Sequence, residues 1–564
     1  MTFSRSDWLG LAVVLLLAFA LRCWQFQNMS VEHFDEGVYA SNLFVGDHLN
    51  NEYPDQHLYA PPLLPTLFEW TLILTAGTTQ SVIWINIILG TALVGVVYWA
   101  ACEWHDARTA LVAGLLAATS EFAIAFSRSA LTDIPLAMFL TVALIAGARA
   151  LKQDSFIWAA VAMISGALAW WTKYNGWLAP AILVSGTVAW CVWTRPAKTE
   201  VFAKLRLVVL IAVGVFVLWL PYLWQLQSIG GYAAVAENHR GYFGGFPGWV
   251  TSFVRQIQIQ NHYLGRTTLA GLVVGWGILI WRQKIEKNAP DVLQLLFLTA
   301  GVVVSFWCIW LVVPIGLLMH WLMQQNATVN DTEVVKAQQE VTPVSFWIHA
   351  AWVVSLLIAI PLYRAYPRLQ LPLHVGMWIA AAAAMTWVVR NATDGRFRYV
   401  FPIIGLFFLL WPLNASPAWE QRTGLQEAAA EIQGNLESHL QNVRRSTLPD
   451  IDCVLYVYAE PGLYYYLSAG DGGSVSYMTQ PAGNLGLAKP GATDNRVPAL
   501  LITGPHAHQD HPELLESSMP IPGLRLIDEV PYQPSDFVLL DDMSPSQLAG
   551  GRNRSIRVWY IEGK

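Results

Sequence analysis

The sequence has little charge and little cysteine. Only 13% of its 564 residues are Asp, Glu, Lys or Arg, which is about half the charged fraction of a typical soluble domain. The five cysteines show no paired spacing, which argues against a disulfide framework or a zinc knuckle. The net charge of −6 is small and there is no basic tract, so we predict no nucleic-acid partner.

Hydrophobic residues, by contrast, make up 55% of the chain. A membrane-spanning helix needs about 20 mainly apolar residues. The runs that approach this length are Trp8–Trp24, Val82–Ala101, Ala107–Phe126, Ile134–Ala150, Phe156–Trp171, Trp177–Trp193, Leu205–Leu226, Leu264–Trp281, Leu293–Met323, Val344–Tyr363, Leu371–Val389 and Tyr399–Leu413. We therefore predict a polytopic α-helical membrane protein with about 12–13 transmembrane helices. The first helix is predicted to stay uncleaved, because it lacks a small-residue cleavage site.

The run Leu63–Ala76 is predicted to lie on the membrane surface, because it is short, contains a glutamate and follows two prolines. Residues 127–133, 171–176 and 230–262 then share the face of the first loop. The basic residues between Arg195 and Arg206 fall on the opposite face, which the positive-inside rule makes cytoplasmic. The first loop is accordingly predicted to lie outside the cytoplasm.

Residues 414–564 are more polar and are predicted to form a small soluble α/β domain after a transmembrane module of residues 1–413. The predicted elements are a helix from Trp419 to about Val443 and strands at Asp452–Tyr458, Ala499–Thr503, Phe537–Leu540 and Ile556–Ile561. The histidine-rich run His506–His511 is predicted to lie in a flexible, proline-flanked loop without a functional role.

An acidic pair, Asp35-Glu36, follows the first hydrophobic run at the edge of the membrane. An ionised carboxylate beside hydrocarbon is costly and usually has a function. In one interpretation, one carboxylate is a general base and its neighbour positions a substrate or a metal. In the other, the pair is a solvated loop or the start of a helix. The residues alone favour neither interpretation.

Two short loops on the same predicted face carry Arg128, Asp133 and Lys173. Asp133 precedes Pro135 and can simply start a helix, which is the simpler interpretation. Alternatively, Asp133 pairs with a cation and Arg128 binds a phosphate. Lys173 either extends to the lipid headgroups or supplies a point charge to a phosphate-bearing substrate.

The long loop after Leu226 contains Glu237, His239 and Arg240 among aromatic residues. Carboxylate and amide groups can bind sugar hydroxyls while aromatic rings stack on the sugar faces, and the alternative is an amphipathic surface helix without a ligand. His239 and His262 are potential metal ligands, but a single loop histidine is more often not one, so we predict no metal site. The sequence does not decide whether a divalent metal is required.

In combination these motifs resemble a known family. The residues that carry the resemblance are Asp35-Glu36, Pro61-Pro62-Leu63, Ser127-Arg128 with Asp133, and Lys173 with Gly176, in this order. Over Trp8–Leu413 the chain is similar to the membrane-embedded GT-C glycosyltransferases, specifically the protein O-mannosyltransferase and aminoarabinose-transferase-like family. The segment with Glu237, His239 and Arg240 resembles the outer-loop surface helix of relatives in this superfamily.

The resemblance implies inverting transfer of a sugar from a polyprenyl-phosphate donor to a protein, lipid or glycan acceptor. By position, Asp35 would be the general base with Glu36 beside it, and Asp133 would help to shape the site. Lys173 and Arg128 would hold the carrier phosphate. The resemblance also implies a location in the plasma (inner) membrane, with the active site on the extracytoplasmic face.

The chain departs from the family pattern at Ala60, where relatives carry a basic residue. His57 is one candidate to replace that residue. Relatives also contact phosphate through a late basic residue, for which both Arg368 and Arg398 fit. Helix counting places the C-terminal tail inside, whereas relatives place it outside, and we follow the relatives.

A transporter or flippase for lipid-linked sugars is the main competing hypothesis. A transporter would be expected to show inverted repeats and polar or broken helices near the middle of the membrane. In this sequence the polar candidates gather at one predicted face, which favours surface chemistry on a lipid carrier. A simple membrane anchor for the tail would not need a dozen or so helices.

Overall fold

The computed structural model describes residues 4–41, 53–75, 80–263, 343–391, 417–440, 451–469, 475–482, 497–515, 521–541 and 554–562, with single positions between 265 and 278. The chain forms two compact units. The first unit comprises residues 1–24, 87–127 and 132–418, and the second comprises residues 25–86, 128–131 and 419–564.

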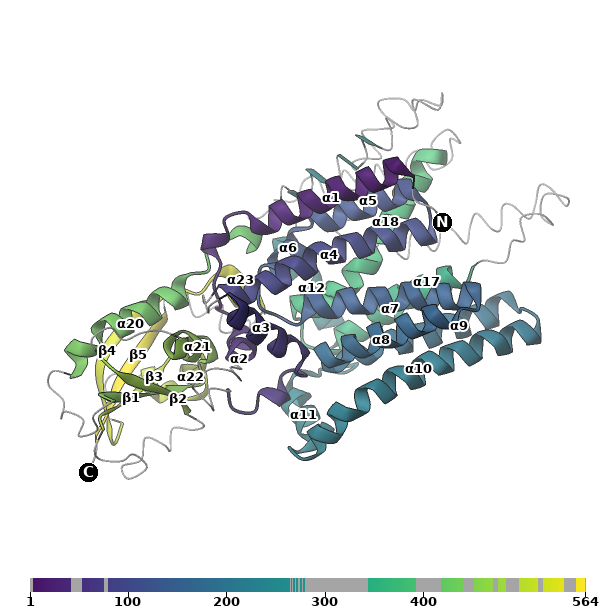
Figure 1. The fold of residues 1–564 in the computed structure, drawn as a ribbon. Helices are drawn as coiled ribbons and strands as arrows, with labels where there is room; N and C mark the ends of the chain where they lie inside the picture. The colour runs from purple at the N-terminus through teal and green to yellow at the C-terminus, as the bar shows by residue number, and fades with distance from the viewer. Residues whose placement is uncertain are drawn as a thin grey trace. The chain divides into compact units, whose positions relative to one another are not determined.

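The first unit is helical (Figure 1). Its described α-helices are α1 (Arg5–Cys23), most of α4 (Ser81–Trp104), α5 (Ala107–Thr119), α6 (Glu121–Ser127), α7 (Asp133–Gln153), α8 (Phe156–Thr172), α9 (Leu178–Thr194), α10 (Lys198–Gln227), α11 (Gly231–His239), α12 (Trp249–His262), α17 (Val344–Ala359) and α18 (Leu371–Asn391). Within the described part of the chain, 6 helices are long and apolar enough to cross a membrane, or 7 if the bent pair α5–α6 is one span. The predicted polytopic α-helical membrane fold is confirmed.

Three predicted spans fall wholly or largely outside the described residues. They are Leu264–Trp281, Leu293–Met323 and Tyr399–Leu413. The predicted number of helices therefore stays a prediction, and so does the domain boundary after residue 413.

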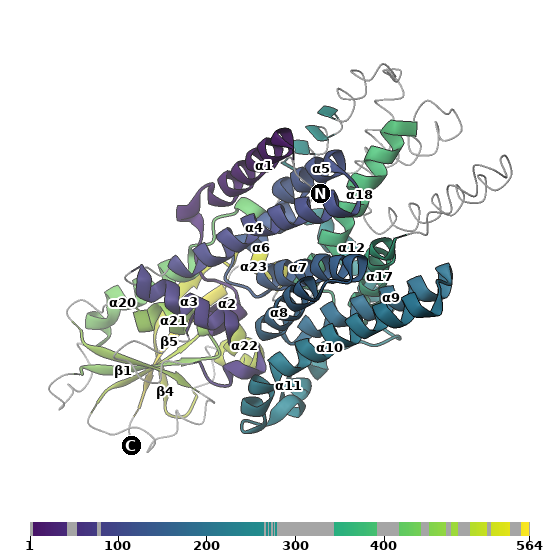
Figure 2. The same cartoon turned by 45° about the vertical axis from the view of Figure 1, so that its right-hand side comes forward.

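Small residues let the helices of the first unit approach closely. A Cβ atom added at Gly147 in α7 would lie 2.6 Å from the Leu183 side chain in α9. One added at Gly186 in α9 would lie 2.6 Å from the backbone of Ile348 in α17. Membrane helices associate through such close packing, because lipid provides no hydrophobic driving force between them. Helices α7 to α10 accordingly lie side by side (Figures 1 and 2).

The predicted span Ala107–Phe126 is not one straight helix. The chain bends by 58° between α5 and α6, at Ser120, whose backbone is extended. The Ser120 hydroxyl accepts the N–H of Ala123 and so begins the next helix. The buried Arg22 guanidinium of α1 donates to the carbonyls of Ala117 and Ala118. These contacts satisfy backbone groups that a helix end leaves without partners.

The second unit combines short helices after α1 with the C-terminal tail. Its elements are α2 (Phe34–Ala40), α3 (Leu63–Leu74), α20 (Gly424–Leu440), β1 (Cys453–Tyr458), α21 (Pro461–Ala469), β2 (Tyr477–Ala482), β3 (Ala499–Thr503), α22 (Pro505–Asp510), β4 (Leu524–Tyr532), α23 (Asp536–Asp541) and β5 (Arg554–Ile561). The five strands form one sheet in the order β2-β1-β3-β5-β4. The pairs of β1 with β2 and β3 are parallel, and those of β5 with β3 and β4 are antiparallel. This sheet confirms the predicted C-terminal α/β part.

The run Leu63–Ala76, predicted as a surface helix, is helical as α3. Its 12 residues extend about 18 Å at the helical rise per residue, which is less than the hydrocarbon thickness of a bilayer, about 30 Å. The length of α3 therefore agrees with a helix that does not cross the membrane.

Two predictions for the tail are wrong. Phe537–Leu540, predicted as a strand, lies in α23, where the Ser535 hydroxyl accepts the N–H of Val538 at the start of the helix. A short apolar run does not distinguish the two element types. The predicted loop at His506–His511 is largely helical as α22, because the Glu460 carboxylate accepts the N–H groups of its first turn.

We expect replacement of Gly37 by Ala to destabilise the protein. An added Cβ would lie 2.2 Å from the backbone nitrogen of Gly462, where α2 packs against α21, and such overpacking costs about 1–3 kcal/mol. Gly434→Ala in α20 is the matched control, because an added Cβ there meets nothing within 4 Å and alanine favours helix by about 1 kcal/mol. Thermal unfolding of the full chain in detergent should show a lower midpoint for Gly37→Ala and a higher one for Gly434→Ala. Equal midpoints for the two variants would contradict the packing.

Candidate functional site

The acidic pair lies in a helix rather than in an open loop. His33 precedes α2, and its ring Nδ1 accepts the N–H of Asp35 at 3.0 Å. Glu36, three positions after His33, accepts the N–H of His33 at 2.9 Å. This reciprocal arrangement is a capping box. Of the two alternatives to a functional pair, the loop is therefore wrong. Asp35 and Glu36 belong to the first turn of a helix.

Glu36 is fully buried, and four donors use its two carboxylate oxygens. Oε2 accepts the N–H groups of Glu32 and His33 and is paired with the Arg422 guanidinium. Oε1 accepts the N–H of Ala130 at 2.6 Å. A carboxylate can accept about four hydrogen bonds. The four donors therefore use all the hydrogen bonds that the Glu36 side chain can accept.

Asp35, the neighbour of Glu36, is only half-buried. Its Oδ2 accepts a hydrogen bond from the Tyr39 hydroxyl, one helical turn later, at 3.4 Å. The two neighbouring carboxylates therefore have different environments, and of the two Asp35 is the one that solvent reaches.

The loop that contains Arg128 is tied to the same unit. The Asn86 amide donates to the carbonyls of Ser129 and Leu131 at 2.6 and 2.7 Å. Arg128 is buried, and its carbonyl accepts a hydrogen bond from Arg422 at 3.1 Å. Asn86 and Arg422 were not among the predicted site residues. A polar amide within an apolar run was the only sequence signal for Asn86.

Asp133 and Lys173 form a buried ion pair in the first unit. Lys173 Nζ lies 2.6 Å from Asp133 Oδ1, and the exposed fractions of the two side chains are 15% and 1%. Asp133 Oδ2 accepts no hydrogen bond from the described residues. Asp133 begins α7 and Lys173 directly follows α8. The arrangement matches the interpretation in which Asp133 pairs with a cation, and it places the Lys173 ammonium at the ends of these helices.

The turn after Lys173 requires a glycine. A Cβ added at Gly176 would lie 2.2 Å from the backbone nitrogen of Trp170, so only glycine allows this turn to fold back on α8. The neighbouring Tyr174 hydroxyl lies 2.9 Å from that of Tyr222 in α10. The Tyr174 ring also packs edge-on against Tyr232 in α11, with centroids 5.6 Å apart. These contacts connect the Lys173 turn to the start of the long loop.

The predicted residues of the long loop lie in and after α11. The Glu237 carboxylate and the Arg240 guanidinium are both mostly exposed and pair at 3.3 Å. His239 Nδ1 lies 2.8 Å from the carbonyl of Val235, one turn earlier. The Arg368 guanidinium stacks over the Tyr366 ring, and Tyr366 packs against Tyr242. The chain near Arg368 therefore reaches the end of the segment that contains Arg240.

The predicted site residues thus form separate groups. Asp35, Glu36 and Arg128 belong to the second unit, whereas Asp133 with Lys173, and the α11 residues with Arg368, belong to the first. Arg398 lies outside the described residues. Among the described residues, no group of three or more His, Cys, Asp or Glu side chains could hold a metal ion.

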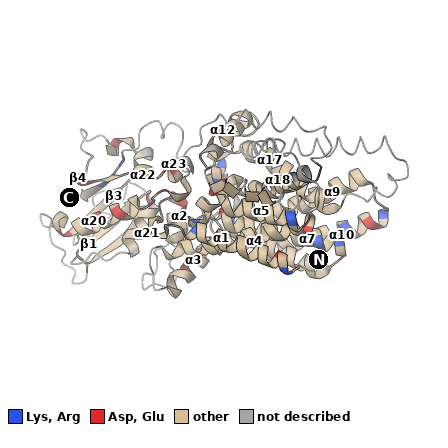
Figure 3. Cartoon of the chain, turned by 90° about the horizontal axis from the view of Figure 1, so that it is seen from above, with Lys and Arg blue, Asp and Glu red and all other residues tan. Residues whose placement is uncertain are grey.

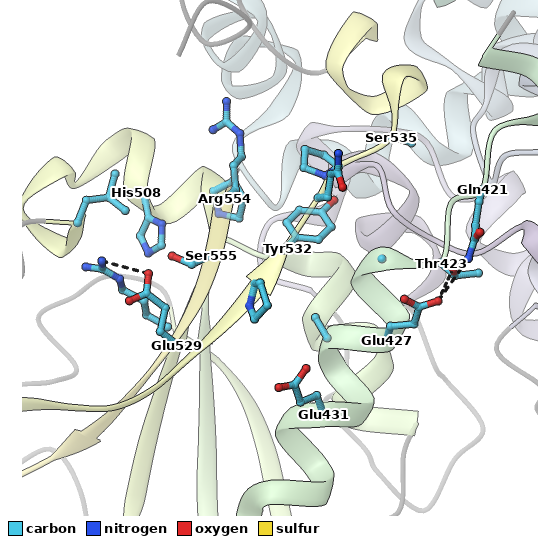
Figure 4. A pocket seen from close by; sticks show the side chains of 18 of the residues that line it. Gln421, Thr423, Glu427, Glu431, His508, Glu529, Tyr532, Ser535, Arg554 and Ser555 are labelled. Atoms are coloured by element: carbon cyan, nitrogen blue, oxygen red, sulfur yellow. Dashed lines mark hydrogen bonds and ion pairs between the residues drawn. The ribbon is translucent and has the colours of Figure 1, made fainter. Parts of the chain in front are cut away.

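A cleft of about 1430 Å³ lies in the tail of the second unit (Figure 4). It is lined by Glu427 and Glu431 of α20 and, on the strands, by Glu529 and Arg557, which form an ion pair at 3.3 Å. Burial raises the pKa of Glu420, another lining residue, to about 7. The sequence did not reveal this cleft, because its walls are assembled from two distant segments, residues 420–431 and 505–557.

Comparisons with known proteins give one family match. Residues 59–224 match the model of the dolichyl-phosphate-mannose-protein mannosyltransferase family. No curated protein matches the chain in sequence. The matched segment contains Arg128, Asp133 and Lys173.

Among solved structures, the chain is similar to ArnT from Cupriavidus metallidurans bound to undecaprenyl phosphate, at 16% identity and a TM-score of 0.42 over 98% of each chain. It is also similar to the S. cerevisiae protein O-mannosyltransferase Pmt1-Pmt2 complex bound to the sugar donor, at 16% identity and a TM-score of 0.31 over 40% of this chain and 34% of that one. A third similarity is to the Archaeoglobus fulgidus oligosaccharyltransferase, at 13% identity and a TM-score of 0.43 over 88% and 69%.

The sequence match over residues 59–224 carries this comparison, since the structural similarities are remote. The resemblance that the motifs indicate is borne out over residues 59–224, which match the model of the dolichyl-phosphate-mannose-protein mannosyltransferase family.

Proposed function

We propose that this protein transfers a sugar from a polyprenyl-phosphate donor to an acceptor outside the cytoplasm, with inversion at the anomeric carbon. The observation that carries the proposal is the buried Lys173–Asp133 pair within the segment that matches the mannosyltransferase family. A polyprenyl donor stays in the bilayer, with its phosphate at the membrane surface. The proposed partner of this phosphate is a cation at the end of a membrane helix, which is where Lys173 lies.

In the proposed reaction Asp35 is the general base. Its carboxylate takes the proton from an acceptor hydroxyl or amine as that atom attacks the anomeric carbon. The bond between this carbon and the phosphate oxygen breaks, and the polyprenyl phosphate leaves with the electron pair. Lys173 stabilises the negative charge that develops on the phosphate. Asp133 orients the Lys173 ammonium through their ion pair.

Glu36 is proposed to position the base rather than to contact the substrate. Both of its oxygens are occupied and the side chain is fully buried, whereas Asp35 is half-buried. Arg128 remains a proposed contact of the carrier phosphate.

The exposed Glu237 and Arg240, the half-buried His239 and the nearby Arg368 are proposed to contact the sugar or the acceptor. Carboxylate, imidazole and guanidinium groups in an aromatic setting suit hydroxyl-rich ligands. Arg398 remains an alternative contact for the phosphate.

The active site is proposed to face the extracytoplasmic side of the plasma (inner) membrane. At the other ends of α7 and α10 basic residues gather (Figure 3). There Arg149 pairs with Glu103 at 2.9 Å, and the Lys204 ammonium donates to the carbonyl of Leu151. Such clusters favour the cytoplasmic side.

Sidedness can be tested with single cysteines in a background that lacks the five native ones. Cysteine at Glu237, after α10, should react with a membrane-impermeant maleimide in intact cells. Cysteine at Lys198, at the first residue of α10, should react only after the membrane is opened. Equal reactivity of the two positions in intact cells would contradict the proposed topology.

Asp35→Asn should lower kcat about 100- to 10,000-fold, the usual contribution of a general base. The measurement is transfer of radiolabelled mannose from polyprenyl-phosphate mannose, with other polyprenyl-phosphate sugars in parallel. Asp55→Asn is the matched control, because Asp55 is an exposed aspartate of the same unit. Full turnover by Asp35→Asn would show that Asp35 is not the base.

Lys173→Met should raise KM for the donor about 10- to 100-fold, the loss expected for a hydrogen bond to a charged group. Because this change leaves Asp133 buried without its cation, the double variant Lys173→Met with Asp133→Asn should fold better and still bind the donor weakly. Lys152→Met, at a lysine with 61% exposure near the other end of α7, is the control. Donor KM values equal to wild type in both Lys173 variants would contradict a role in phosphate binding.

A further inference from the structure

The helix that carries Asp35 is too short to be stable by itself. Helix α2 has seven residues, whereas isolated helices shorter than about 12 residues are marginal in water. Its direction must therefore be set by tertiary contacts. Those contacts also determine where the Asp35 carboxylate points.

Arg422 of the tail makes a large share of these contacts. Its Nη2 pairs with Glu36, and its Nη1 donates to the carbonyl of Arg128 at 3.1 Å. Its Nε lies 3.8 Å from Glu32 Oε2. The exposed fraction of the Arg422 side chain is 4%, and its guanidinium stacks over the Phe537 ring at 4.3 Å. One buried cation therefore contacts the start of α2 and the Arg128 loop at once.

The backbone of Arg422 is also tied to the chain just before α2. Its N–H donates to the carbonyl of Asn28 at 2.8 Å, and its carbonyl accepts a hydrogen bond from the Ser30 hydroxyl. The N–H of Val31 donates to the hydroxyl of Tyr466, another tail residue, at 2.6 Å. The guanidinium is thus held at a defined distance from Glu36 and is not a mobile surface charge.

A second buried carboxylate confirms that the tail supports this loop. Glu32 Oε1 accepts hydrogen bonds from the Tyr532 hydroxyl and the Ser535 N–H, and Oε2 accepts one from the Ser535 hydroxyl. Glu32 before α2 and Glu36 in its first turn therefore each have at least one partner from residues beyond 420. Buried polar groups need such partners, because leaving them without hydrogen bonds is costly.

We propose that Arg422 is a positioning residue, through which the C-terminal domain holds Glu36 and sets the orientation of the Asp35 carboxylate. This inference rests on the proposed function, in which Asp35 is the general base. Arg422 does not touch the substrate in this proposal. It acts through Glu36 and through the carbonyl of Arg128.

The test measures kcat and KM of the full chain in detergent, with polyprenyl-phosphate mannose as the donor. Arg422→Met should lower kcat about 100-fold, the loss typical of a small misplacement of a catalytic group, and leave the donor KM within about twofold. Arg422→Lys keeps the charge and one contact and should recover part of kcat. Arg525→Met, at a tail arginine with 53% exposure, is the matched control and should resemble wild type.

Since Arg422→Met removes the cation from a buried carboxylate, the double variant Arg422→Met with Glu36→Gln is measured as well. The glutamine at position 36 keeps a hydrogen-bonding side chain without the negative charge. The double variant should therefore fold, but its kcat should remain low. Wild-type kcat in the folded Arg422 variants, with an inactive Asp35→Asn, would overturn the positioning role and leave the proposed function standing. An active Asp35→Asn would overturn both.

Discussion

The local structure around the candidate base depends on the burial of one carboxylate, that of Glu36. Removal of this group from water is costly, and only hydrogen bonds and an opposite charge offset that cost. The donors come from three separate parts of the chain: the start of α2, Ala130 and Arg422. Two oxygen atoms therefore hold together segments that lie up to 386 residues apart in sequence, and they give a seven-residue helix a defined direction.

The membrane helices obey a different constraint, since charge is tolerated only where a partner or the aqueous surface is near. Lys173 is paired with Asp133 at one end of α7, and Arg149 is paired with Glu103 near the other end. Small residues pack the spans between these ends. The ion pairs of α7 thus lie near the ends of the helix, and the proposed role of Lys173 is placed at one of these ends.

Much of the helical part was predictable, because the bilayer imposes a length that hydrophobic runs reveal directly. The spans α7, α9 and α10 begin or end within a few residues of the predicted limits, except that α10 starts seven residues earlier. The break between α5 and α6 was not predictable, since it depends on Arg22 of another helix. Phe537–Leu540 was misassigned for a related reason: a four-residue apolar run takes its structure from its neighbours.

The sequence by itself determined the membrane fold, the order of the charged motifs and the resemblance to a family, because these depend on local composition and spacing. It also placed Asp35, Asp133 and Lys173 among the candidates. Only the tertiary structure decided which carboxylate of the Asp35-Glu36 pair is buried, and it alone identified Asn86 and Arg422. The physical reason is that burial and pairing are properties of the folded chain: a carboxylate has the same chemistry at both positions until distant donors surround one of them.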